Sequence, residues 1–151
     1  MATIERVKRR SAHRTQWAAQ FAVASELCKQ NYQVALTLGN HPSVDLMVIS
    51  PEERSFNIDV KGLYKKNFWG VSEKPKSKSL FYVFAFVPDN EPNRFFVLTQ
   101  AEVNTGVAQH IEKIKAARTA RGKSIINAEK FPGLPWDLVQ THENSWHKLP
   151  K

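Results

Sequence analysis

Residues 43–61 constrain the fold of this chain more than any other segment, because their pattern is that of two strands joined by a tight turn. In the second strand, residues 55–61, apolar and polar side chains alternate. A period of two places successive side chains on opposite faces of a strand. One face therefore carries Phe56, Ile58 and Val60, and the other carries Asp59 and Lys61. The segment predicts an antiparallel hairpin with one buried face.

Two aspartates occupy matching positions in this hairpin. If the turn is centred on Glu52, Asp45 stands directly opposite Asp59, with β-carbons about 4.5–5.5 Å apart. Like charges at that spacing repel each other unless a positive charge lies between them. The sequence therefore predicts a site for a divalent cation between Asp45 and Asp59.

The first strand of the hairpin, residues 44–49, is apolar on both faces after Asp45, which favours a central position in a sheet. A carboxylate at the entrance of a central strand is costly to bury without a partner. Asp45 is for this reason more informative than an acid on the surface of a helix.

The remaining elements follow from periodicity and from turn residues. A helix is predicted over residues 15–30, with an apolar stripe of Trp17, Phe21, Ala24 and Cys28. Further strands are predicted at residues 32–38, 80–87 and 94–98. Thr99 and Glu102 form a capping-box signature for a second helix over about residues 100–121, which ends at Gly122.

These elements predict a single α/β domain over residues 1–151, with a mixed, largely antiparallel sheet flanked by helices. Residues 62–79 are expected to be irregular. Residues 123–151 are expected to close the fold, with Phe131, Leu134, Trp136, Leu138, Val139 and Trp146 packed inward.

The charge of the chain favours a polyanionic partner. Twenty-two Lys and Arg against fourteen Asp and Glu give a net charge of +8. Nucleic acid is the expected partner and an anionic membrane surface is the competing one. The longest apolar run has eight residues, far short of the ~20 that a spanning helix needs. The single cysteine and the polar N-terminal segment predict a cytoplasmic protein.

Two segments are predicted to contact DNA, and each has an alternative interpretation. Residues 1–14 form a basic arm that includes Arg9 and Arg10, and such a run is equally typical of a solvated face. In residues 62–79, lysines suited to phosphates are interleaved with aromatic residues suited to stacking. The candidates are Lys65, Lys66, Trp69, Lys74, Lys76 and Lys78. The aromatic residues of this segment fit equally well as core residues beneath a basic loop.

Other chemistries find no support in the sequence. The chain lacks a complete phosphate-binding loop, a dinucleotide-binding glycine pattern and a nucleophile elbow. A structural zinc site is disfavoured because His142 and His147 have no cysteine pair to join them.

The order of Glu26 on a helix, Asp45 at a strand and Asp59-Val60-Lys61 at the next strand resembles the PD-(D/E)xK nuclease superfamily, which includes restriction endonucleases and Holliday-junction resolvases. The resemblance implies a restriction-endonuclease-like core and a metal-dependent DNA endonuclease, with Mg²⁺ as cofactor and Mn²⁺ as a substitute. Asp45 and Asp59 would bind the metal, and Lys61 would orient or deprotonate the attacking water. Such enzymes often act as homodimers.

Glu26 takes its role from this resemblance, as the helical acid of the metal site. By spacing alone, Glu26 is better explained as a solvated side chain next to Lys29 and Gln30. The chain departs from the family pattern in having Val44 in place of proline and no evident helix after Lys61. Two other interpretations remain: a nucleic-acid-binding protein that keeps the fold without cleavage, and an interaction subunit. In both, Lys61 forms an ordinary salt bridge with Asp59.

Overall fold

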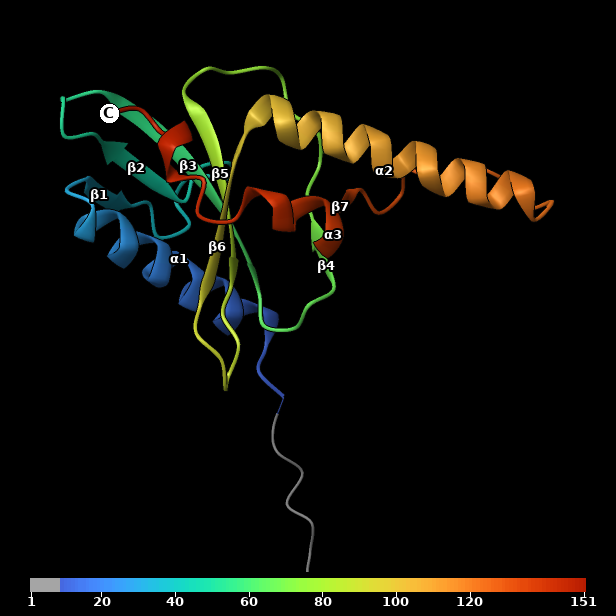
Figure 1. Ribbon diagram of the computed structural model, residues 1–151, viewed down its shortest axis with the longest axis horizontal. Helices are drawn as coiled ribbons and strands as arrows, with labels where there is room; N and C mark the ends of the chain where they lie inside the picture. Colours follow the sequence, from blue (N-terminus) through green and yellow to red (C-terminus); the bar gives the residue numbers. More distant parts are fainter. Residues whose placement is uncertain (1–8) are drawn as a thin grey trace, which may run out of the picture.

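A computed structural model describes residues 9–151 of the chain. Its centre is a five-stranded sheet with the order β1-β2-β3-β5-β6 (Figure 1). The strands are β1 (Gln33–Leu36), β2 (Leu46–Ile49), β3 (Ser55–Leu63), β5 (Leu80–Phe86) and β6 (Arg94–Thr99). All neighbouring strands are antiparallel except β3 and β5, which are parallel. The predicted α/β class with a mixed, mostly antiparallel sheet is confirmed.

Two long helices flank the sheet, α1 (Ala12–Lys29) and α2 (Gln100–Ala120). A second, two-stranded sheet pairs β4 (Phe68–Gly70) with β7 (Gly133–Pro135). The chain ends in short helical turns: α3 (Trp136–Val139), η1 (Gln140–His142) and η2 (Trp146–Lys148). Within residues 9–151, no helix combines the length and apolar character needed to cross a lipid bilayer.

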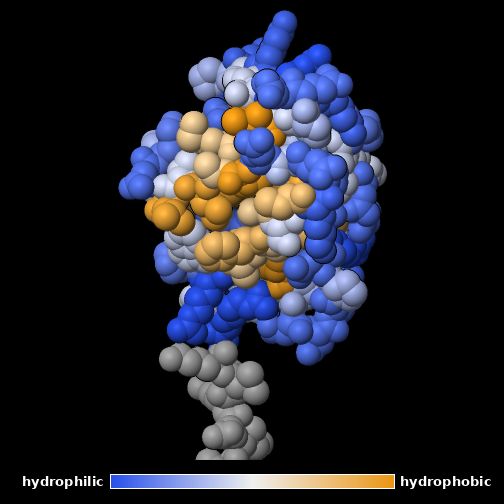
Figure 2. Space-filling model, turned by 90° about the vertical axis from the view of Figure 1, so that its left-hand side faces the viewer, coloured by the Kyte–Doolittle hydropathy of each residue, from blue (hydrophilic) through white to orange (hydrophobic). Residues whose placement is uncertain are grey.

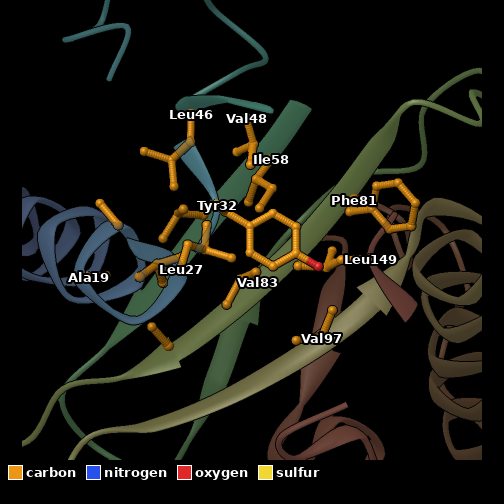
Figure 3. Packing of buried hydrophobic residues seen from close by; sticks show 14 of the residues in the cluster. Ala19, Leu27, Tyr32, Leu46, Val48, Ile58, Phe81, Val83, Val97 and Leu149 are labelled. Atoms are coloured by element: carbon orange, nitrogen blue, oxygen red, sulfur yellow. The ribbon is translucent and has the colours of Figure 1, made fainter. Parts of the chain in front are cut away.

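The core has two layers because β5 is buried on both faces. Phe81, Val83 and Ala85 point toward α1, and Tyr82, Phe84 and Phe86 point toward α2. Figure 3 shows the first layer, where Leu27 and Tyr32 pack with residues of β2, β3 and β5. The second layer includes Val103 and Val107 of α2, and this helix begins with the predicted capping box of Thr99 and Glu102.

The predicted apolar stripe of α1 is confirmed at Ala24 but is wrong at Phe21 and Cys28. The helix begins at Ala12, earlier than predicted, with Ser11 as its N-cap, and its buried residues are Thr15, Ala19, Gln20, Val23, Ala24 and Leu27. Phe21 is 56% exposed, and Cys28 is exposed as well. Small side chains meet the sheet because α1 lies close to the backbone of β3. The large aromatic side chains Trp17 and Phe21 instead stack on each other, with ring centroids 5.7 Å apart.

The outer face of β2 is also more exposed than predicted. β2 has a neighbour on each side, but Met47 is 57% exposed and Ile49 is 39% exposed. The reason is that α2 packs on β5 and β6, so it does not extend over β1 and β2. Figure 2 shows the side of the molecule on which β1 and β2 lie, and apolar surface gathers there.

The C-terminal segment packs as expected in part. Leu134 and Val139 are buried, and Trp136 stacks on Trp69 with centroids 5.4 Å apart. Glu143 receives two hydrogen bonds of 2.8 Å from Arg94 and forms a bridge to β6. Phe131 departs from the prediction, since it is 75% exposed.

Gly62, near the end of β3, is required by the close approach of α1. A β-carbon at this position would lie 2.8 Å from Cβ of Ala19 and 3.0 Å from the carbonyl oxygen of Thr15. We expect Gly62→Ala to lower the free energy of unfolding by about 1–3 kcal/mol, measured by urea denaturation. Gly70→Ala is the matched control, because nothing lies within 4 Å of its added carbon. Equal stability of the two variants would contradict this packing.

Candidate functional site

The hairpin of β2 and β3 brings the two predicted aspartates together. The observed register pairs Leu46 with Ile58 and ends there, so Asp45 lies just before β2. The backbone N–H of Asp45 donates to the carbonyl of Ile58 at 3.0 Å, which is one residue out of the register that would place Asp45 directly opposite Asp59. The two carboxyl groups lie near enough for the charge of Asp59 to act on Asp45, but the directly opposed pair predicted from a turn centred on Glu52 is not observed.

The carboxylate of Asp59 is buried and paired on both oxygens. Asp59 is only 3% exposed. Nζ of Lys61 lies 2.9 Å from its Oδ1, and Nζ of Lys74 lies 2.7 Å from its Oδ2. Two ammonium groups thus compensate the cost of burying one carboxylate. Lys61 was predicted at this position, whereas Lys74 was predicted only as a DNA contact.

Asp45 lies in a less favourable electrostatic environment than Asp59. The pKa of Asp45 is raised above its ordinary value, and burial is the largest cause. The hydrogen bond from the backbone N–H of Val60, 2.8 Å long, lowers the pKa, while the negative charge of Asp59 raises it. The positive charges of Lys61 and Lys74 also lower the pKa of Asp45, but they do not cancel the rise. The site therefore holds one carboxylate whose charge is incompletely compensated.

Helix α1 contributes two amide side chains that the sequence interpretation missed. Nε2 of Gln20 donates to Oδ1 of Asp45 at 3.3 Å, and Gln20 is 6% exposed. Gln16 binds the backbone of β3, donating to the carbonyl of Val60 at 2.7 Å and accepting from the N–H of Gly62 at 3.1 Å. Oε1 of Gln20 is buried without a hydrogen-bond partner. The signal in the sequence was a pair of glutamines four residues apart, on the helix face that also carries Ala19.

Glu26 is not part of this cluster. It lies six residues after Gln20, which is about 9 Å further along the helix axis. Its Oε1 accepts a hydrogen bond of 3.5 Å from Gln30. Among residues 9–151, no group of three or more His, Cys, Asp and Glu side chains is arranged to hold a metal ion.

The donors that remain still suit Mg²⁺. Magnesium prefers oxygen ligands and is commonly held by one or two carboxylates together with water. Asp45 and Asp59 supply the carboxylates, and Oε1 of Gln20, which has no hydrogen-bond partner among residues 9–151, is a neutral oxygen of the side chain that contacts Asp45. These three side chains would hold the ion.

The loop that carries Lys74 is fixed on α2 by two side chains. Asn104 accepts from the backbone N–H of Lys74 at 3.2 Å and donates to its carbonyl at 2.8 Å. Gln100 binds the backbone of Ser77 and of Pro75 with two bonds of 2.6 Å. Lys74 is therefore held near Asp59 although residues 71–79 contain no helix or strand.

Tyr82 lies beneath this pair. Its register partner in the neighbouring strand is Asp59, and Nζ of Lys74 lies 5.5 Å from the centre of its ring. The hydroxyl is buried without a hydrogen-bond partner. Burial and the charge of Asp59 raise the pKa of Tyr82, so the phenol stays protonated.

An open cavity of about 470 Å³ lies beside Asp59. Lys61, Lys74 and Lys130 line it together with Asp59, so positive charge prevails. Phe68, Phe131 and Pro132 contribute apolar walls. A polyanion can approach Asp59 through this opening.

The predicted DNA contacts divide into buried and accessible residues. Trp69 is 2% exposed and stacks on Trp136, so it belongs to the core, the alternative interpretation for these aromatic residues. Nζ of Lys66 lies 5.6 Å from the centre of the Trp136 ring. Lys76 and Lys78 are exposed.

The described part of the basic arm lines a second cavity, of about 510 Å³. Arg9 donates to the hydroxyl of Tyr64 at 2.8 Å, and Arg10 pairs with Asp89. Lys65 lines the same cavity, and Phe68 borders both cavities. The arm residues before Arg9 lie outside the described residues.

Comparisons with models of known families, with curated proteins and with solved structures found no match for this chain.

Proposed function

We propose that this protein is a metal-dependent DNA endonuclease with a restriction-endonuclease-like core. The observation that carries the proposal is the proximity of Asp45 and Asp59 at the end of the hairpin of β2 and β3, with Asp59 next to Lys61 at the wall of an open, positively charged cavity. In this core, the family's helix after the third strand is replaced by residues 64–79, which contain β4 and the loop bound to α2.

Each side chain of the site has a separate role in phosphodiester hydrolysis. Asp45, Asp59 and Oε1 of Gln20 would hold the metal ion. A bound Mg²⁺ would lower the pKa of a coordinated water and offset negative charge on the phosphate. The ammonium of Lys61, which pairs with Asp59, donates a hydrogen bond to the attacking water or to a phosphate oxygen. Lys74 and Lys130 attract the neighbouring phosphates.

A second candidate function is DNA binding without cleavage. It is favoured by the two ammonium groups that already satisfy Asp59 and by the lack of Glu26 in the cluster. In this case the ion pairs of Asp59 with Lys61 and Lys74 stabilise the fold. The lysines that line the cavity then contact DNA without any cleavage.

Cleavage of a panel of substrates separates the two functions. Supercoiled, linear, branched and single-stranded DNA are incubated with the wild type in Mg²⁺, in Mn²⁺ or with a chelator. The nuclease cuts at least one substrate with either metal and none with the chelator. Lys61→Ala is expected to lower the rate about 100-fold, a typical contribution of one positioned proton donor or acceptor. Lys113→Ala, an exposed lysine of α2, is the control and keeps the rate. Binding of DNA without cutting under any metal would refute the enzyme and favour the second function.

A further inference from the structure

Phe131 is an apolar side chain at the rim of the candidate site with nothing to cover it. It is 75% exposed, although it lines the cavity that also contains Asp59 and Lys61. A single exposed apolar side chain is common on protein surfaces, so the exposure of Phe131 alone does not mark a binding surface. Its position, rather than its exposure alone, identifies it as a contact for whatever enters the cavity.

The charges around Phe131 specify the chemistry of that ligand. Lys61, Lys74 and Lys130 line the same cavity against the single carboxylate of Asp59. Nζ of Lys130 lies 5.6 Å from the centre of the Phe131 ring, so one cation is adjacent to the exposed aromatic face. Phe68 also lines the cavity, and the centre of its ring lies 5.5 Å from that of His110. An aromatic ring between ammonium groups suits a ligand that alternates flat apolar rings with phosphates.

We infer that the cavity binds a single-stranded segment of DNA, with one unpaired base stacked on Phe131 and the adjoining phosphates on Lys130 and Lys74. Bases inside a duplex already stack on their neighbours on both faces, so only an unpaired base offers a free face to the ring. This inference rests on the proposed function and deepens it, since it names single-stranded or frayed DNA as the substrate form.

Binding is measured in a chelator, so that cleavage plays no part. Fluorescence anisotropy gives the affinity of a labelled strand of about 15 nucleotides and of its blunt duplex. Phe131→Ala is expected to weaken single-strand binding about 10-fold, within the range known for one stacked base, and to change duplex binding by less than about 2-fold. Phe131→Trp keeps the ring and is expected to restore wild-type affinity.

Ile126→Ala is the matched control, because Ile126 is also 75% exposed but does not line this cavity. It is expected to leave both affinities unchanged. Equal losses for the single strand and the duplex in Phe131→Ala, or no loss in either, would overturn the inference.

An abasic position moved along the strand tests stacking directly. One abasic position is expected to weaken binding to the wild type and to have little effect on binding to Phe131→Ala, because the missing base and the missing ring remove the same contact. Additive losses would overturn the inference. These results do not depend on cleavage: failure of stacking leaves a metal-dependent nuclease intact, and failure of cleavage leaves the stacking measurable.

Discussion

Asp59→Asn is expected to lower the rate of DNA cleavage by a factor of about 1,000 or more while DNA binding stays equal or improves. The substitution removes the negative charge needed to bind the metal, and loss of a group that acts as part of a catalytic unit has effects of this order. The fold is expected to survive, because Lys61 and Lys74 are about 30% and 27% exposed and can reach water. Both lysines then become available to phosphates.

The measurement is single-turnover cleavage of the best substrate in Mg²⁺, with affinity determined in a chelator. Asp137→Asn is the control, since Asp137 is exposed on the short helix α3. It should match the wild type in both assays. A cleavage rate for Asp59→Asn within about 10-fold of the wild type would contradict the assigned role.

Asp45→Asn is expected to abolish cleavage and, at the same time, to stabilise the metal-free protein by about 1 kcal/mol at neutral pH. The asparagine can still accept from the N–H of Val60. Its Nδ2 can also donate to Oε1 of Gln20 once that amide turns over, which satisfies a buried acceptor that now lacks a partner. The repulsion between Asp45 and Asp59 disappears.

The gain should depend on pH with a defined sign. Because the folded protein raises the pKa of Asp45, this residue contributes stability below its ordinary value of 3.8 and loses it as pH rises through the folded pKa. The difference in unfolding free energy between Asp45→Asn and the wild type is therefore largest near neutral pH and shrinks in acid. Urea denaturation in a chelator at several pH values measures it. Lower stability of Asp45→Asn at neutral pH would show that the carboxylate is favourably placed.

The hairpin register could be predicted from the sequence because it depends on local features. Alternation predicted which residues of β3 share a face, and the turn between the strands predicted the register in which β2 pairs with β3. The same holds for the start of α2, where Thr99 and Glu102 are three residues apart and bind each other's backbone.

The other half of the site depends on contacts that no local pattern specifies. Lys74 reaches Asp59 through an irregular loop whose course is set by Gln100 and Asn104. Helix α1 packs on the sheet through the face that carries its small side chains, because these allow a close approach to β3. Gln20, rather than Glu26, therefore faces Asp45. The periodicity of apolar residues predicts a helix, but it does not determine which face of that helix packs against the sheet.

In the proposed nuclease, the two lysines that pair with Asp59 would make the affinities for a cation and for DNA interdependent. Each oxygen of this carboxylate is already held by an ammonium group, so a cation can contact it only when a lysine turns away. Phosphates give the lysines another partner, and the coupling between two ligands of one site is reciprocal. In the proposed nuclease, the pairing of Asp59 with Lys61 and Lys74 would act as a thermodynamic link, through which DNA would strengthen metal binding and the metal would strengthen DNA binding by the same factor.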